Sequence, residues 1–389
     1  MKLFKSLLVA PAALGLLAPI SASASEVNLN DISNYSDVEG VDFANSFSND
    51  DSNIEALLAG GEGLVDDSSP DGFSETTSAS FTVEGYLGFE YEEANTADDA
   101  TSAGYSFQMD LNTSFTGEDA LDISIDAGTG GTDGIDEFDG NSLGDGLFVD
   151  GVTYTFPVGS ATAFVGSNTD GTALFTSACV YGGPGAMLDD CGNVNAGWTG
   201  GQLSAGASYD FGNGLTAAFG TSTESNNTRG IFTEESFDRF GINTAYTADN
   251  YGLSLTYSVI ESLDANDALD DEEDKFTAFQ AYYTPENTGL PSISAGYEFG
   301  DIGGAAAGAD EQSSFMVGLT WSEVGPGSAG VAAGHSNTNE SGDELYQFEA
   351  YYAYPVNDSM TITRLIYTLD AAGDLDDTTG MMLKTSFAF

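Results

Sequence analysis

From about residue 80 onward, hydrophobic and polar positions alternate with a period of two. The first such segment places Phe81, Val83 and Leu87 on one face of an extended chain and Thr82 and Glu84 on the other. Because successive side chains of a strand point to opposite faces, each segment predicts a strand with one apolar and one polar face. The clear segments are 81–91, 105–111, 121–125, 203–211, 240–246, 253–259, 293–299, 315–321, 346–354, 361–369 and 381–389. Residues 276–283 are ambiguous, and 330–334 are weak.

The charged residues of nearly every segment share one face, and the aromatic residues share the other. A Lys or Arg facing lipid at the middle of a bilayer costs about 2–4 kcal/mol. We therefore expect the charged faces to line a polar lumen and the aromatic faces to meet lipid. A sheet in lipid must close, because an open edge leaves backbone groups unpaired. A water-soluble β sandwich is the alternative fold, but it has no need of an aromatic face on almost every strand.

Short and long connections alternate along the chain. Short turns fall near 116–119, 157–160, 212–214, 248–250, 284–291, 323–328 and 355–358, and long loops near 92–103, 128–150, 168–200, 222–238, 260–275, 300–313, 336–343 and 370–377. Outer-membrane barrels have short periplasmic turns and long external loops. Seven turns and eight loops join sixteen strands. The prediction is an all-β fold, a 16-stranded antiparallel transmembrane β-barrel over residues 79–389, wide enough for an aqueous channel.

The two ends of the sequence agree with this topology. Met381, Leu383 and Phe389 share one face of the last segment, and Lys384 lies on the other, which predicts a final strand that closes the barrel. Residues 1–24 carry two lysines, an apolar run and an A-x-A site, so they predict a signal peptide and export. Residues 25–78 are acidic, contain no Lys or Arg and predict a mostly disordered periplasmic segment.

Removal of residues 1–24 leaves five basic residues against 62 acidic ones, a net charge of −57. This balance excludes nucleic acid as a partner, because phosphate binding needs clustered Lys and Arg. It creates a field that attracts cations. Solvation of the external loops alone explains the acidity equally well, so a contribution to ion selectivity is one of two readings.

The two cysteines, Cys179 and Cys191, predict a disulfide in an exported chain. Closing so short a loop is worth about 3 kcal/mol by the loop-entropy estimate. Metal binding is the competing interpretation, but the single histidine, His335, is far away in the sequence.

Short motifs throughout the chain resemble those of marine cyanobacterial outer-membrane porins, of the OprB-like and general-diffusion family. They lie at 2–4, 8–15, 60–63, 115–119, 179–184, 191–195, 208–214, 324–327 and 354–358 and in the closing strand. The resemblance implies a homotrimer of sixteen-stranded channels in the outer membrane, surrounded by lipid and lipopolysaccharide. Larger relatives carry an S-layer-homology segment, and residues 26–75 contain none, so cell-wall anchoring is not expected.

The resemblance also implies that the third external loop, 168–200, folds into the barrel and narrows it. This loop is the longest and holds both cysteines together with Asp170, Asp189 and Asp190. A loop stapled outside the membrane is the less favoured alternative.

Six charged residues are expected on the lumen side of the strands. They are Glu84, Asp110, Asp122, Arg239, Arg364 and Lys384. Arg364 and Lys384 are predicted side by side on the last two strands, and Glu84 is close enough to pair with Lys384. These charges either form salt bridges that hold the lumen in register or create a transverse field; exposed ion pairs are individually weak, which slightly favours the first.

These features predict a passive, water-filled channel for small hydrophilic solutes and ions with a weak preference for cations. A channel that prefers iron or sugars, and a non-conducting structural or adhesin barrel, are the alternatives. Tracks of inward aromatic residues would indicate sugars, and only Tyr86 and Tyr351 interrupt an inward face of small polar and acidic residues. No cofactor and no enzymatic activity are expected, because His335 has no visible nucleophile partner.

Overall fold

The computed structural model describes residues 77–92, 101–131, 135–138, 140–186, 188–223, 237–263, 269–286, 289–303, 310–336, 345–371 and 377–389. The predicted signal peptide and nearly all of the predicted acidic segment lie outside these ranges. Within them, no helix is long and apolar enough to cross a membrane.

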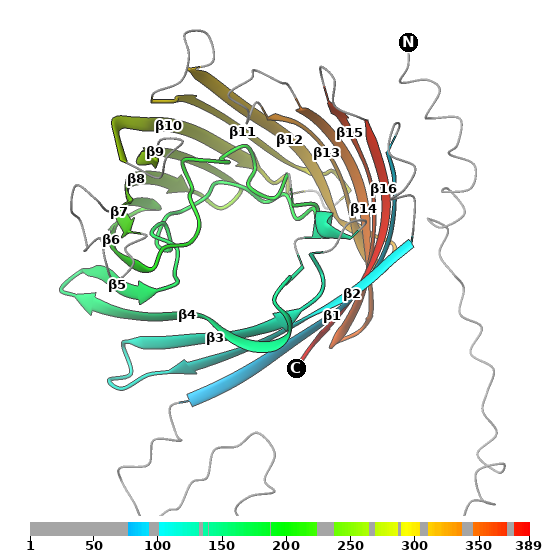
Figure 1. Ribbon diagram of the computed structural model, residues 1–389, viewed down its shortest axis with the longest axis horizontal. Helices are drawn as coiled ribbons and strands as arrows, with labels where there is room; N and C mark the ends of the chain where they lie inside the picture. The colour runs from blue at the N-terminus through cyan, green and yellow to red at the C-terminus, as the bar shows by residue number, and fades with distance from the viewer. Residues whose placement is uncertain are drawn as a thin grey trace, which may run out of the picture. The chain divides into compact units, whose positions relative to one another are not determined.

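The described residues form sixteen β strands and one short 3-10 helix, η4 (Asp136–Phe138). The strands are β1 Thr77–Glu92, β2 Thr101–Thr113, β3 Ala120–Gly128, β4 Gly144–Val158, β5 Ala161–Ser167, β6 Leu203–Gly212, β7 Leu215–Thr223, β8 Asp238–Thr247, β9 Tyr251–Leu263, β10 Leu269–Tyr283, β11 Ser292–Asp301, β12 Glu311–Val324, β13 Gly327–Ser336, β14 Leu345–Asn357, β15 Met360–Ala371 and β16 Thr378–Ala388. Each strand pairs with its sequence neighbours, and β1 pairs with β16, so the sheet is a closed barrel (Figure 1). The predicted sixteen-stranded fold is confirmed.

The two ends of the barrel sequence close the sheet. β1 and β16 are antiparallel, with Val83 opposite Phe387 and Leu87 opposite Leu383. The Phe389 N–H donates to the Phe81 carbonyl at 3.1 Å, and the Phe81 N–H donates to the Phe389 carbonyl at 2.9 Å. Their rings stack with centroids 5.6 Å apart. The terminal aromatic residue is therefore part of the sheet, and no strand edge is left open at the closure point.

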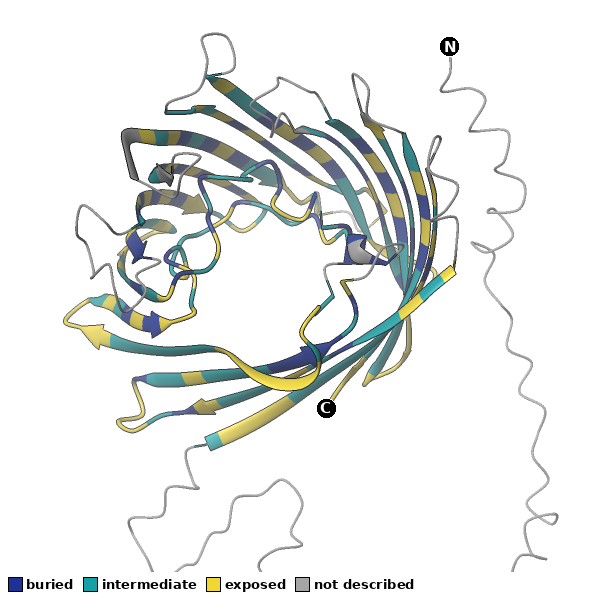
Figure 2. Ribbon diagram, viewed as in Figure 1, coloured by how far each residue is buried: buried dark blue, intermediate teal, exposed yellow. Residues whose placement is uncertain are grey.

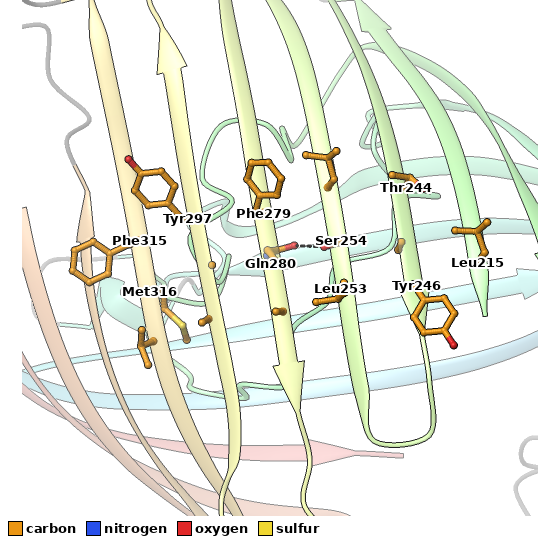
Figure 3. A pocket seen from close by; sticks show the side chains of 16 residues that line it. Leu215, Thr244, Tyr246, Leu253, Ser254, Phe279, Gln280, Tyr297, Phe315 and Met316 are labelled. Atoms are coloured by element: carbon orange, nitrogen blue, oxygen red, sulfur yellow. Dashed lines mark hydrogen bonds between the residues drawn. The ribbon is translucent and has the colours of Figure 1, made fainter. Parts of the chain in front are cut away.

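Apolar side chains cover the outer face of the barrel, as the alternation predicts. Buried and exposed residues alternate as bands along most strands (Figure 2). Figure 3 shows this outer face over β7 to β12, where Leu253, Phe279, Tyr297 and Phe315 line a shallow apolar groove. The next residue after Phe279, Gln280, faces inward and accepts a hydrogen bond from Ser254 at 3.2 Å. A sheet that is apolar outside and polar inside is what a lipid environment requires.

The ambiguous segment 276–283 is the middle of β10, and the weak segment 330–334 lies in β13. In β10 the inward residues include Phe276, which packs with Ala278 and with Ala196 from the loop between β5 and β6. An inward aromatic residue that is covered by a loop explains why this strand has aromatic residues on both faces.

Asp119 organises the short turn between β2 and β3. One carboxylate oxygen accepts hydrogen bonds from the Thr116 N–H (2.8 Å) and from the hydroxyls of Ser114 and Thr116 (both 2.8 Å). The other accepts one from the Tyr154 hydroxyl of β4 at 2.7 Å. Burial alone raises the pKa of Asp119, but the hydrogen bonds from Tyr154 and from the turn outweigh it and hold this pKa well below its usual range.

We expect Asp119→Asn to lower the resistance of the barrel to unfolding at neutral pH. Because the folded-state pKa is depressed, the ionised carboxylate stabilises the fold at neutral pH, and this contribution is lost as the pH falls below the usual range of Asp. The midpoint of urea unfolding in detergent, at about pH 7 and about pH 3, measures the effect. The variant should lose less on acidification than the wild type. Asp210→Asn is the control, since Asp210 accepts a bond only from the Gly212 N–H, and an equal loss in both variants would contradict the assignment.

Candidate functional site

The loop between β5 and β6, residues 168–202 and here called L3, lies inside the barrel (Figure 1). Its backbone N–H groups donate to inward polar side chains: Thr176 to Asn243 of β8 at 3.0 Å and Ala178 to Ser254 of β9 at 3.1 Å. Val180 donates to the Ser294 hydroxyl of β11 at 2.9 Å. Small polar residues on the inner faces of three strands thus accept hydrogen bonds from the backbone of a loop that has no regular secondary structure of its own.

Glu298 of β11 holds the second half of L3. Its carboxylate accepts the Asn195 N–H at 2.9 Å, the Asn195 side-chain amide at 2.8 Å and the Ala196 N–H at 2.7 Å. Both Glu298 and Ala196 are almost completely buried. Nearby, the indole N–H of Trp198 donates to the Ser222 hydroxyl of β7 at 2.8 Å. L3 is therefore attached to the barrel at both ends of its path.

Cys179 and Cys191 form the predicted disulfide within L3, with Cα atoms 6.3 Å apart. The closed ring rests on the barrel through the Gln280 amide, which donates to the Asp190 carbonyl at 2.9 Å. The Ser314 hydroxyl donates to the Gly192 carbonyl at 3.3 Å. The ring lies within the lumen. The structure therefore differs from the alternative, in which the disulfide holds the loop outside the membrane.

A small hydrophobic core fills part of the lumen. L3 contributes Tyr181 and Leu188, and the loop between β3 and β4, residues 129–143 and here called L2, contributes Ile135 and Phe138 of its described part. The barrel contributes inward apolar side chains from six strands: Tyr86, Met316, Ala332, Tyr351, Leu365, Tyr367 and Met382. The inward position of L2 was missing from the prediction, because residues 128–150 were treated as an external loop.

Arg364 corrects the sequence prediction, which placed it in the lumen. In the register of β15, Thr363 is opposite Lys384, whereas Arg364 is opposite Leu383 and Tyr352 on the outer face. The inner face of β15 holds Leu365 instead, which is fully buried in the core described above. The prediction was wrong because it assumed that every inward face is polar, and L2 and L3 make this one apolar.

Glu84 and Lys384 face the lumen on β1 and β16 and form the predicted ion pair. The Lys384 ammonium lies 3.3 Å from Glu84 Oε1. Glu84 also accepts hydrogen bonds from the hydroxyls of Tyr86 (2.6 Å) and Ser386 (2.7 Å). The Lys384 ammonium lies 5.6 Å from the centre of the Phe138 ring, which places L2 directly beside the pair.

Asp110 of β2 and Asp122 of β3 lie on the inner face of the barrel. Their hydrogen-bond partners are neutral, so this part of the inner face is negatively charged. Asp110 accepts hydrogen bonds from Gln108 at 3.0 Å and from the Ser124 hydroxyl at 2.9 Å. Asp122 accepts one from the Asn112 amide at 2.5 Å. Neither carboxylate has a cationic partner within the described ranges, so both charges act on the water of the lumen.

The remaining predicted residues have different surroundings. Asp170 accepts the Gly200 N–H at 2.5 Å and so joins the two ends of L3. Asp189 and Asp190 are exposed on L3. Arg239 of β8 faces inward and donates to the Thr199 carbonyl at 3.2 Å. Arg239 on β8 and Lys384 on β16 are thus on different sides of the lumen lining.

Three acidic residues with many loop contacts were not singled out from the sequence: Glu137, Glu298 and Glu349. Glu298 and Glu349 have inward positions in clear alternating segments, so the pattern could have found them. Glu137 lies in L2, where no pattern marks it. The described part of the chain has no group of three or more His, Cys, Asp or Glu side chains placed to hold a metal ion.

No protein-family model and no curated protein matches this sequence. Among solved structures, the anion-selective porin from Comamonas acidovorans matches with a TM-score of 0.59 and 13% identity, over 81% of this chain and 99% of that chain. OprB of Pseudomonas putida matches with a TM-score of 0.57 and 12% identity, over 81% and 94%. A loop-deletion mutant of OmpT, an outer-membrane protein of Vibrio cholerae, matches with a TM-score of 0.54 and 10% identity, over 81% and 100%. The chain therefore has the β-barrel fold of these proteins.

Proposed function

We propose that the protein is an outer-membrane porin, a water-filled channel through which small hydrophilic solutes and ions diffuse passively. A closed barrel of sixteen strands is wide enough for an aqueous lumen. L3 lines the inner face from β7 to β14 and narrows this lumen, which makes it the constriction loop. The predicted signal peptide and the porin fold support the outer membrane as the location, and the resemblance supports a homotrimer.

Asp110 and Asp122 are the observation that favours cations over anions. Their carboxylates are held by Gln108, Ser124 and Asn112, all neutral donors. A fixed charge that no cation of the described residues neutralises raises the local concentration of counter-ions in the lumen. The channel therefore passes cations more readily than anions, although it has the fold of a porin described as anion-selective.

The inward tyrosines do not favour a sugar channel. Tyr86 is 4% exposed and Tyr351 is 5% exposed, because both pack in the core beneath L2 and L3. A ring that is buried by a loop cannot stack on a passing sugar. General diffusion is the function that these positions favour.

Reversal potentials across planar lipid bilayers test this proposal. With the purified protein and a gradient of potassium chloride, we expect discrete conductance steps and a reversal potential of the sign that potassium permeation produces. The absence of any step would refute the channel, and a reversal potential of the opposite sign would refute the cation preference. A higher salt concentration should reduce the preference for cations, because salt screens the fixed charges.

A further inference from the structure

Arg364 of β15 is a cation on the lipid-facing side of the barrel, where β14, β15, β16 and β1 lie side by side (Figure 1). In the register of these strands it lies between Tyr352 and Leu383, two outward residues. Its neighbours along β15, Thr363 and Leu365, are buried on the inner face. A guanidinium group on the lipid-facing side is costly at the middle of the bilayer and tolerated near an interface, so its depth decides its role.

The strands around Arg364 place it close to the periplasmic interface of the proposed outer-membrane orientation. β15 begins at Met360, directly after the short turn that follows β14, and Arg364 lies in the first half of the strand. Two exposed aromatic residues lie still closer to the turn, Tyr354 opposite Ile362 and Phe387 opposite Met360. Aromatic residues form a girdle at this level of outer-membrane barrels. A long cationic side chain just above the girdle can reach the headgroups of the periplasmic leaflet.

No described residue neutralises Arg364. Within the described ranges, its side chain forms no ion pair, hydrogen bond or cation–π contact. The hydroxyl of its neighbour Tyr352 donates to the Val324 carbonyl at 3.0 Å, on the side of β14 away from β15. By contrast, the other outward cation of the described strands, Lys275 of β10, forms an ion pair with Glu273 at 3.4 Å. Any anion that compensates Arg364 must therefore come from outside the described part of the chain.

A hydroxyl group and open space lie beside Arg364 on the same outer face. Thr385 of β16 is diagonal to Arg364 and opposite Gly85 of β1, and diagonal neighbours lie within reach of a long side chain. At Gly85 no atom lies within 4 Å of the place where a Cβ atom would be. Among the described residues the Thr385 hydroxyl has no hydrogen-bond partner, whereas the hydroxyl of Thr379, farther along this face, donates to that of Thr368 at 3.5 Å. This end of the outer face therefore has two polar groups with room for a ligand.

Apolar side chains continue from this point toward the middle of the bilayer. Leu383 and Met381 of β16 lie opposite Leu87 and Phe89 of β1 at successive outward positions, and these four residues are here called the apolar strip. Leu87 is 48% exposed and Met381 is 37% exposed. A cation and a hydroxyl at the interface, followed by an apolar strip that leads into the bilayer, match the headgroup and the acyl chains of a lipid.

We propose that Arg364 and Thr385 bind the headgroup phosphate of an anionic phospholipid in the periplasmic leaflet, with its acyl chains on the apolar strip. The planar guanidinium offers paired N–H donors, which match the geometry of a phosphate. The Thr385 hydroxyl adds one O–H donor. Lipid binding at this site is independent of conduction, and it goes beyond the proposed channel function.

A second copy of this chain is the competing occupant of this face. The outward carboxylates of β10, β11 and β12 include Glu273, Asp301 and Glu311, which lie at the external end of the barrel. Copies related by an axis along the membrane normal lie at the same height, so these three carboxylates do not meet Arg364. Glu323, beside the turn between β12 and β13, is closer to the periplasmic level and therefore enters the test.

Native mass spectrometry of the purified full-length protein in detergent tests the proposal, with phosphatidylglycerol and phosphatidylcholine as the probes. The wild type should bind phosphatidylglycerol about fivefold more tightly than phosphatidylcholine, and Arg364→Gln should bind the two lipids equally. Thr385→Val should lose part of the preference. Lys275→Gln is the matched control, because it removes an outward cation that Glu273 already neutralises, and it should keep the full preference. An equal preference in the wild type and in Arg364→Gln would overturn the proposal.

Further measurements separate the lipid from other anions. Displacement of phosphatidylglycerol by excess inorganic phosphate would show that the site takes a free anion and would refute the lipid. An oligomer that forms without lipid and dissociates in both Arg364→Gln and Glu323→Gln would show that a second copy supplies the anion. Arg364→Lys guards against a folding defect in the glutamine variant: it keeps the charge but loses the paired donors, so its preference for phosphatidylglycerol should lie between those of the wild type and Arg364→Gln. A preference in Arg364→Lys no greater than that of Arg364→Gln would refute the role of the charge.

Discussion

Replacing Glu298 with alanine should release the second half of L3 and produce a wider, noisier channel. The substitution leaves the backbone N–H groups of Asn195 and Ala196 without acceptors. Ala196 is fully buried, and a buried donor without an acceptor costs about 1–3 kcal/mol. The free-energy cost of two such donors is larger than a loop without regular secondary structure can tolerate. This part of L3 should therefore leave the inner face of β11 and move into solvent.

Single-channel conductance and its noise measure this outcome, and limited proteolysis of L3 provides a second reading. The barrel should stay intact, because backbone hydrogen bonds hold β11 between β10 and β12. Glu323→Ala is the control, since Glu323 is an exposed residue of β12 beside the turn between β12 and β13. Identical conductance and proteolysis in Glu298→Ala and Glu323→Ala would show that Glu298 does not hold the loop.

In the proposed channel, changing both Asp110 and Asp122 to lysine should replace the expected preference for cations with a preference for anions. The partners of the two carboxylates are neutral, so the substitution replaces two uncompensated negative charges with two positive ones in the lumen. Fixed charges act over about 8 Å at physiological salt, which is enough to reach ions in a narrowed lumen. The substitution should therefore reverse the sign of the reversal potential at low salt and have less effect at high salt.

The control for this charge reversal changes the same net charge outside the lumen. Asp249 and Asp358 lie in the turns between β8 and β9 and between β14 and β15, and lysine at both positions should leave the sign of the reversal potential unchanged. Asparagine at 110 and 122 should give an intermediate value. If lysine at positions 110 and 122 and lysine at positions 249 and 358 shift the potential equally, the overall charge of the protein, rather than the inner face of β2 and β3, governs selectivity.

The strands were predictable because a barrel in lipid repeats one constraint along its whole length. Each strand must be apolar outside, and each connection must return the chain to the next strand, so β1, β12 and β16 can be identified without knowing their neighbours. The pairing of Glu84 with Lys384 also followed from this logic, since closure makes the first and last strands adjacent.

The inner face was less predictable, because loops distant in sequence decide its chemistry. Leu365 and Tyr367 face inward in a core that Tyr181, Leu188 and Phe138 of the loops complete. Alternation alone assigned this apolar face to lipid, so Arg364 was wrongly predicted to face the lumen. Likewise, nothing local marks Glu137 as a buried residue; its environment exists only after L2 and L3 meet at β14.

The burial of the disulfide fixes the order of events when the molecule is made. Cys191 is 1% exposed, and the carbonyls of its two neighbours, Asp190 and Gly192, accept hydrogen bonds from Gln280 and Ser314 of the barrel, so an oxidising enzyme has no room to reach the Cys191 sulfur once L3 is in place. Oxidation by such an enzyme must therefore precede closure of the barrel around L3. A chain that inserts while still reduced would keep the Cys191 thiol protected from oxidant, so the redox state of this loop records whether oxidation preceded insertion.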